Sequence, residues 1–151
     1  MTPTETAPAA KATVRPTLTG IHHIGITVTD VEASAAWYER VLGLGRLFQV
    51  RHYRSEANGY TIVLGPPDGS FSLGIDHHPA NKGDGFDPTR TGLDHLSFQV
   101  ESVDALHAWG THLESQGVPN SGVYPMQGFP LSLVTFCDPD GVQLEFMAFH
   151  G

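Results

Sequence analysis

Apolar and polar residues alternate in two stretches of the chain with the period of a β-strand. The apolar positions are Ile24, Ile26 and Val28 in the first stretch and Leu96, Phe98 and Val100 in the second. Side chains on a strand point alternately to its two faces, so each stretch predicts a strand that is buried on one side only.

A helical pattern follows each predicted strand. The first helix has Val31, Ala35, Tyr38 and Leu42 on its apolar face, and the second has Val103, Leu106 and Leu113. Asp30 is the expected N-cap of the first helix and Gly43 its expected stop. The second helix is predicted from Ser102 to Gly117.

Further strand-like runs complete each half of the chain. They are "RLFQVRHY", "GYTIVLG" and "SFSLGID" in the first half, and "LSLVTFC" and "VQLEFMAF" in the second. Turn sequences at Asn58-Gly59, at residues 66–69 and at residues 138–141 separate them. Each half therefore has the predicted order βαβββ.

The two halves repeat at a constant offset of 72 residues. The matching pairs are Gly20 and Gly92, His23 and His95, Val28 and Val100, Val31 and Val103, Trp37 and Trp109, Pro67 and Pro139, Asp68 and Asp140, and Gly69 and Gly141. A repeat of this kind indicates duplicated modules. We predict an α+β fold in which two tandem βαβββ modules form a curved mixed sheet around a cleft.

The expected organisation is a disordered tail at residues 1–19 and a single domain at residues 20–151. The modules span about 20–78 and 92–150, and residues 79–91 link them. A second irregular segment, residues 117–130, is interpreted either as a lid over the cleft or as an ordinary surface loop. The first nineteen residues lack the apolar run of a signal peptide, and no later segment approaches the length of a membrane span, so we expect a cytoplasmic protein.

Charge and cysteine content exclude several classes of function. Eight Lys and Arg residues against sixteen Asp and Glu give a net charge of −8, which argues against a nucleic-acid partner. The single cysteine, Cys137, excludes an internal disulfide and a multi-cysteine zinc site. We interpret Cys137 as a small buried apolar residue.

Adjacent histidines, His22 and His23, stand where the first strand begins. By alternation only His23 faces the cleft, opposite Ile24, and its repeat partner His95 does the same. Glu145 alternates with apolar residues of the last strand and faces the same side. His23, His95 and Glu145 together predict a metal site of the two-histidine, one-carboxylate type, with coordination positions left open.

Other polar residues are weaker candidates. Catalytic roles are considered for Tyr124, His77 and His78, and substrate binding for Gln127, Tyr124 and Arg51, with Tyr53 and Tyr60 as further specificity candidates. The remaining histidines, His52, His107, His112 and His150, show no partner pattern.

The stretches "GIHHIGITVTDVEASAAWYERVLGL", "GLDHLSFQVES" and "DPDGVQLEF" resemble the vicinal oxygen chelate superfamily over about Leu18 to Phe149. That superfamily includes glyoxalase I, methylmalonyl-CoA epimerase, fosfomycin-modifying thiol transferases, extradiol dioxygenases and bleomycin-binding proteins. The resemblance implies the βαβββ fold and carries the metal-ligand set over to His23, His95 and Glu145. It leaves the reaction open, because the scaffold supports many chemistries.

Two departures from the family pattern reduce the number of reactions that this chain is expected to catalyse. Glyoxalase I and the epimerase resemble each other in a fourth ligand in module one, where this chain has Leu73 by strict offset or Gly74 by alternation. Extradiol enzymes resemble each other in a His and a Tyr, and the corresponding places here hold Met126, Gln127 or Gly128, and Thr135. The usual acid–base pair is therefore absent, unless His77, His78 or Tyr124 replaces it.

The sequence favours a metal-dependent, dioxygenase-like enzyme that acts on a small oxygen-rich substrate chelated through vicinal oxygens. Fe(II) or Mn(II) is the expected ion, with Zn(II), Ni(II) or Co(II) as alternatives. The alternatives in function are a metal-free protein that sequesters a small molecule such as an antibiotic, and a lyase, isomerase or thiol transferase. Exposed sheet edges predict a homodimer in which each cleft is built within one chain or from both.

Overall fold

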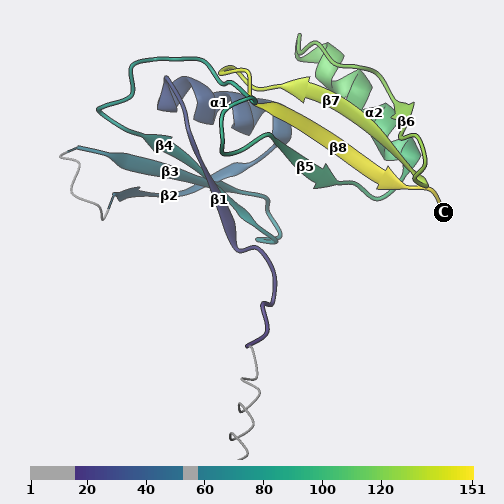
Figure 1. Cartoon of the computed structure of the whole chain (residues 1–151), viewed down its shortest axis with the longest axis horizontal. Helices are drawn as coiled ribbons and strands as arrows, with labels where there is room; N and C mark the ends of the chain where they lie inside the picture. Colours follow the sequence, from purple (N-terminus) through teal and green to yellow (C-terminus); the bar gives the residue numbers. More distant parts are fainter. Residues whose placement is uncertain (1–15, 53–57) are drawn as a thin grey trace, which may run out of the picture.

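The computed structural model describes residues 16–52 and 58–151. In chain order its elements are β1 (His23–Thr27), α1 (Val31–Leu42), β2 (Gly45–Arg51), β3 (Tyr60–Gly65), β4 (Ser72–His77), β5 (His95–Gln99), α2 (Val103–Ser115), β6 (Tyr124–Pro125), β7 (Leu131–Cys137) and β8 (Gln143–Phe149). Figure 1 shows the two halves of the chain side by side, each with its own sheet and helix.

Two four-stranded mixed sheets form the framework. Sheet A has the strand order β1-β4-β3-β2, and sheet B has the order β5-β8-β7-β6. In each sheet the first and last strands of the module pair in parallel, whereas the remaining pairs are antiparallel. The predicted α+β fold of two βαβββ modules is confirmed. The strands of the two modules form two separate sheets.

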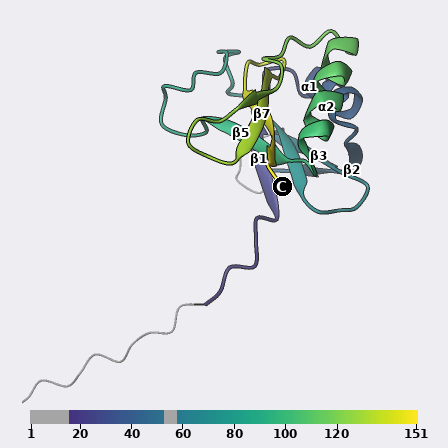
Figure 2. The same cartoon turned by 90° about the vertical axis from the view of Figure 1, so that its right-hand side faces the viewer.

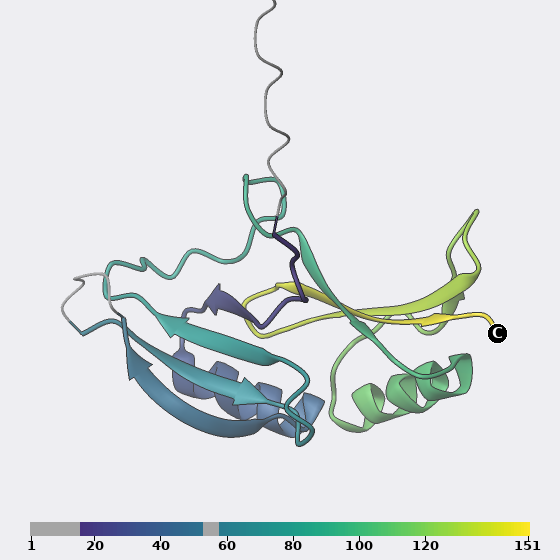
Figure 3. The same cartoon turned by 90° about the horizontal axis from the view of Figure 1, so that it is seen from below.

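Helix α1 begins and ends where the sequence predicts. The Asp30 side chain accepts a hydrogen bond from the Ala33 amide as N-cap, and Gly43 adopts the left-handed conformation at the C-terminus. Ala35, Tyr38 and Val41 are fully buried against the sheet core. Both helices lie on the same side of the molecule (Figures 2 and 3), so each sheet keeps one face free of helices.

The two modules contact each other through α1 and the turn between β7 and β8. The Tyr38 hydroxyl donates to Asp138 Oδ2 at 2.9 Å, and the Thr29 amide lies 3.2 Å from both carboxylate oxygens of Asp140. At the other end of the helices, His112 Nε2 lies 2.9 Å from the Val41 carbonyl oxygen. These contacts fix the position of one sheet relative to the other.

The two irregular segments expected from the sequence differ from each other in the structure. Residues 79–91 contain neither helix nor strand, whereas the segment 117–130 contributes β6, which pairs with β7 at the edge of sheet B. Residues 1–15 of the expected tail lie outside the described residues. Cys137 is exposed, so its interpretation as a buried residue is wrong. Neither helix of the described part of the chain has the length and apolar content needed to cross a lipid bilayer.

Candidate metal and substrate site

His95 and Glu145 lie together on the open face of sheet B. His95 begins β5, Glu145 occupies the middle of β8, and parallel pairing places Ser97 beside Glu145. His95 is two residues from Ser97, so the two functional side chains project from one face in neighbouring rows. His95 Nε2 lies 3.8 Å from Glu145 Oε1.

Asp94 holds the other nitrogen of the His95 ring. Its Oδ1 lies 2.6 Å from His95 Nδ1, which assigns the ring proton to Nδ1 and leaves Nε2 directed toward Glu145. The hydrogen bond to Asp94, with a smaller contribution from Glu145, raises the pKa of His95 above its ordinary value. A carboxylate behind the far nitrogen is the arrangement that commonly orients a metal-binding histidine.

The 3.8 Å separation fits a shared ion. It exceeds the length of a hydrogen bond, yet both atoms can bind one cation at metal–ligand distances of about 2.0–2.2 Å. The donor set is a neutral imidazole and a carboxylate, which suits a first-row divalent ion. His95 and Glu145 therefore form two thirds of the predicted metal site.

The first module presents His23 with His22 beside it. Their Nδ1 atoms lie 3.0 Å apart, and both rings line a cavity on the open face of sheet A. The expectation that only His23 faces this side is wrong, because β1 begins at His23 and strand alternation does not extend to His22. His22 is the repeat counterpart of Asp94, so in both modules the preceding side chain contacts Nδ1 of the histidine.

A single chain does not bring His23 to the other two predicted ligands. Within residues 16–52 and 58–151, no group of three His, Cys, Asp or Glu side chains is placed to hold a metal ion. The three-ligand site remains a prediction, and within one chain it lacks His23.

Strand pairing identifies the counterpart of Glu145 in the first module. Ser97 pairs with Glu145 in sheet B, and Gly25 pairs with Gly74 at the equivalent point of sheet A. The counterpart is thus Gly74, at an offset of 71 (145 − 74) rather than 72. Module one has no side chain at the position of the fourth ligand.

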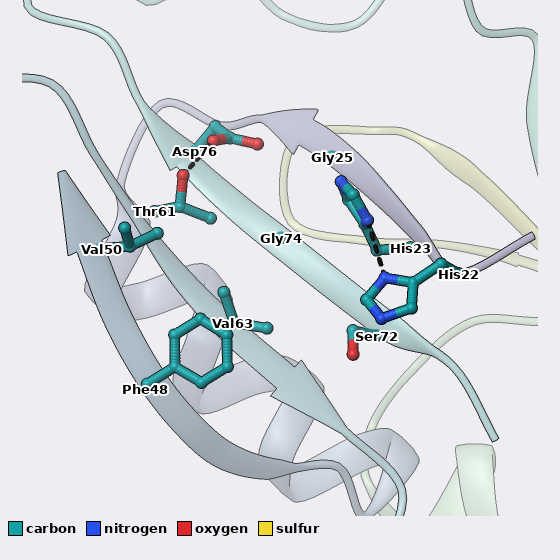
Figure 4. A pocket seen from close by; sticks show the side chains of 10 residues that line it. All are labelled: His22, His23, Gly25, Phe48, Val50, Thr61, Val63, Ser72, Gly74 and Asp76. Atoms are coloured by element: carbon teal, nitrogen blue, oxygen red, sulfur yellow. Dashed lines mark hydrogen bonds between the residues drawn. The ribbon is translucent and has the colours of Figure 1, made fainter. Parts of the chain in front are cut away.

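The open face of sheet A contains a cavity of about 310 Å³. Figure 4 shows its lining: His22, His23, Gly25, Phe48, Val50, Thr61, Val63, Ser72, Gly74 and Asp76. At one end Asp76 accepts a hydrogen bond from the Thr61 hydroxyl, and Asp76 Oδ1 lies 2.9 Å from His52 Nε2. The volume suits a small organic molecule.

The remaining candidates lie at several places in the two modules. Tyr124 pairs with Leu133, which pairs with Met147, so it shares the open face of sheet B with Glu145. Gln127 is exposed in the turn between β6 and β7. Arg51, Tyr60 and His77 form one row on the face of sheet A opposite the cavity.

His78 follows β4, and its ring packs 4.5 Å from that of His52 between centroids. Tyr53 lies outside the described residues. The roles considered for these residues stay predictions.

Sequence reasoning missed the contact of His52 with Asp76 and Thr61. The alternation that buries Leu73 and Ile75 also places Asp76 on the open face, which was a usable signal. His52 gave none, because it reaches Asp76 from beyond the end of a different strand.

The fold and this donor set define a protein of the vicinal oxygen chelate type. A model of the Glyoxalase/Bleomycin resistance protein/Dioxygenase superfamily matches residues 20–146, and the chain belongs to this family.

Relatives of similar length support the same assignment. The Bacillus subtilis (strain 168) protein YwkD is 34% identical over 137 residues, covering 85% of this chain and 95% of YwkD. The crystal structure of a glyoxylase/bleomycin resistance protein/dioxygenase domain from Frankia sp. EAN1pec has a TM-score of 0.77 and 30% identity, covering 89% of this chain and all of that domain.

A longer relative carries a reaction in its name. The Bacillus subtilis (strain 168) protein "Putative ring-cleaving dioxygenase MhqA" is 24% identical over 129 residues, which cover 85% of this chain and 40% of MhqA.

Proposed function

We propose that this protein is a divalent-metal-dependent enzyme with dioxygenase-like activity on a small oxygen-rich substrate, which binds through two neighbouring oxygens. The observation that carries the proposal is the pair of His95 Nε2 and Glu145 Oε1, 3.8 Å apart, with Asp94 holding the far nitrogen of the imidazole. Fe(II) or Mn(II) is the proposed ion, and the cytoplasm is the proposed compartment.

The third ligand, His23, is proposed to come from a second copy of the chain. Both open sheet faces expose large apolar side chains, with Phe48 and Val50 on sheet A and Tyr124 and Phe149 on sheet B. Such surfaces favour association. A homodimer that places sheet A of one copy over sheet B of the other brings His23 to His95 and Glu145.

The chain's own residues hold and orient the reacting groups in this scheme. A divalent ion held by His95, Glu145 and the second copy's His23 would supply Lewis acidity to the substrate oxygens. Asp94 keeps the His95 proton on Nδ1, so the lone pair of Nε2 stays free to bind a metal ion. Glu145 contributes one negative charge, and Gly74 adds none. Because the first module has Gly74 at the counterpart of Glu145, it supplies no fourth ligand, and we propose a site with three protein ligands.

A dioxygenase reaction is supported by the open three-ligand set and by the relationship to MhqA. Ring cleavage consumes one dioxygen for each catechol, and both oxygen atoms enter the ring-opened product. The chain departs from the usual acid–base pair of extradiol enzymes, so Tyr124, on the open face of sheet B, is the proposed proton donor or acceptor.

Metal content and oxygen uptake test the proposal together. Protein purified without chelator, or reloaded anaerobically with Fe(II), is expected to hold about one ion per chain and to consume oxygen with catechols. Glu145→Gln is expected to lose the ion, and Glu114→Gln on the exposed face of α2 is the matched control. Less than about half an ion per chain after reloading would overturn metal dependence. A loaded protein that consumes no oxygen across a catechol panel would overturn the dioxygenase assignment.

A further inference from the structure

Two glycines form the floor of the cavity on sheet A, which we call the glycine trough. Strand pairing sets Phe48, Val63, Gly74 and Gly25 in one row across the open face. A Cβ added at Gly25 would lie 2.7 Å from Asp76 Oδ2, and one added at Gly74 would lie 3.0 Å from Thr61 Cγ2. Only glycine leaves this floor flat without moving its neighbours.

The side wall of the trough is apolar and incompletely covered. Phe48 and Val50 on β2 are 60% and 48% exposed, and Val63 on β3 stands beside them (Figure 4). A flat backbone floor beside an aromatic and two β-branched side chains offers van der Waals contact to one face and the edge of a planar ring.

Asp76 closes one end of the trough with a carboxylate oxygen, Oδ2, that accepts no hydrogen bond from residues 16–52 and 58–151. Its Oδ1 is occupied by the Thr61 hydroxyl and by His52 Nε2 at 2.9 Å. Its Oδ2 turns toward Gly25, and no donor from the described residues reaches it. A carboxylate oxygen fixed on one side and open on the other is placed to accept a hydrogen bond from a ligand.

The opposite end is polar as well. His23 pairs with Ser72, four residues along the sheet from Asp76, which is about 13 Å of strand. The imidazole and the carboxylate both project into this interval, which leaves room for one substituted ring.

We propose that the glycine trough selects the substrate: a planar aromatic ring with its chelating oxygens at the His23 end and a hydrogen-bond donor, hydroxyl or amino, at the Asp76 end. Asp76 is then a specificity residue, positioned by His52 and Thr61. The His23 end of this proposal rests on the proposed function. The Asp76 end does not, because a carboxylate accepts a hydrogen bond from the ligand without an ion.

Paired ligands test the Asp76 end directly. The probes are 1,2,4-trihydroxybenzene and 4-methylcatechol, which differ by a hydroxyl against a methyl group, titrated calorimetrically under anaerobic conditions. The wild-type protein is expected to prefer the trihydroxy ligand by about tenfold or more, as for a hydrogen bond to a charged group. Equal affinity for the two ligands would overturn the proposal.

Three variants separate recognition from folding. Asp76→Ala removes the acceptor for the ligand, so the preference is expected to disappear. Gly74→Ala raises the floor and is expected to weaken both ligands equally. Gly45→Ala is the matched strand control, because its added methyl meets only the Gly65 carbonyl oxygen, at 3.9 Å. A preference retained in Asp76→Ala, or Gly74→Ala affinities equal to those of Gly45→Ala, would overturn the assignment.

The same titrations on chelator-treated protein distinguish this proposal from the proposed function. Without an ion both ligands are expected to bind more weakly, yet the Asp76-dependent preference should persist. If the protein binds no metal or consumes no oxygen but still prefers the trihydroxy ligand, the proposed enzyme function is overturned and the proposal for the glycine trough stands. If a metal-loaded, oxygen-consuming protein shows no preference between the two ligands, only the proposal for the glycine trough is overturned.

Discussion

Asp94 illustrates how a residue outside the predicted ligand set shapes the site. The carboxylate fixes the His95 tautomer through its 2.6 Å contact with Nδ1. It also raises the pKa of His95, so it makes the imidazole more basic. A more basic imidazole binds a divalent ion more strongly, provided that the pH keeps Nε2 unprotonated.

Removing this carboxylate should weaken metal binding. Asp94→Ala is expected to lower the affinity for a divalent ion about 10- to 100-fold, because the ring loses its orienting partner. Competition with a metallochromic chelator at neutral pH measures the change. Asp84→Ala, in the exposed segment between the modules, is the control for loss of negative charge. An affinity unchanged by Asp94→Ala would contradict this role.

Single residues were predictable where strand alternation applies and not where it ends. Within β5 and β8, alternation placed His95 and Glu145 on one face. His22 precedes β1, so alternation did not apply to it. Cys137 was interpreted as buried, whereas alternation with the buried Phe136 places it on the open face, where it is exposed. The contact between His52, which follows β2, and Asp76 on β4 depends on the pairing of β2 with β3 and of β3 with β4.

Among the elements, α1 has a second role beyond covering sheet A. Its buried Tyr38 donates to Asp138 in the turn between β7 and β8, which joins the two modules. Burial, followed by the charge of Asp138, raises the pKa of Tyr38, so the hydroxyl remains a donor. Burial also raises the pKa of Asp138 above its ordinary value, and the hydrogen bond from Tyr38 opposes that rise.

Tyr38→Phe should therefore destabilise the protein in a pH-dependent way. At neutral pH we expect the free energy of unfolding to fall by about 1–3 kcal/mol, because the buried carboxylate loses a donor. The hydroxyl stabilises ionised Asp138, so its contribution is present above the Asp138 pKa and is lost as the pH falls through that value. Urea denaturation over a descending pH series measures both effects, with Tyr60→Phe as control. A loss that stays constant with pH would contradict the assignment.

Most elements followed from local pattern and from the repeat. The caps at Asp30 and Gly43 and the alternation around Ile26 predicted β1 and α1. The short strand β6 was missed, because two residues, one of them Pro125, carry no periodic signal. The constant offset failed by one residue at β4, and only the pairing of Gly25 with Gly74 identified the counterpart of Glu145.

At the scale of the whole molecule, each open sheet face carries only part of the proposed metal site. Sheet B carries the His95 and Glu145 pair, and sheet A carries His23. The edge strand β2 is exposed along its whole length. Completion of the proposed metal site by a second copy explains both the divided ligand set and the uncovered apolar side chains.

Mixing two defective variants tests this shared site. His23→Ala and Glu145→Ala are each expected to bind no metal at the proposed site. Unfolded and refolded together, they should regain about a quarter of the wild-type metal content, because half of the dimers are mixed and each mixed dimer has one intact site. Each variant refolded alone is the control. No recovery in the mixture would contradict a site shared between chains.

The glycine pair beneath the trough marks a difference between the two copies of the repeat, because Glu145 in the second module stands where the first has Gly74. The halves share one architecture, yet the second carries two of the three proposed metal ligands and the first carries the cavity proposed to select the substrate. In this scheme the residues proposed to recognise the substrate lie on other strands and at other positions than His95 and Glu145. Substitutions at Phe48, Val50, Gly74 or Asp76 are therefore expected to change which ligands bind without removing a proposed metal ligand.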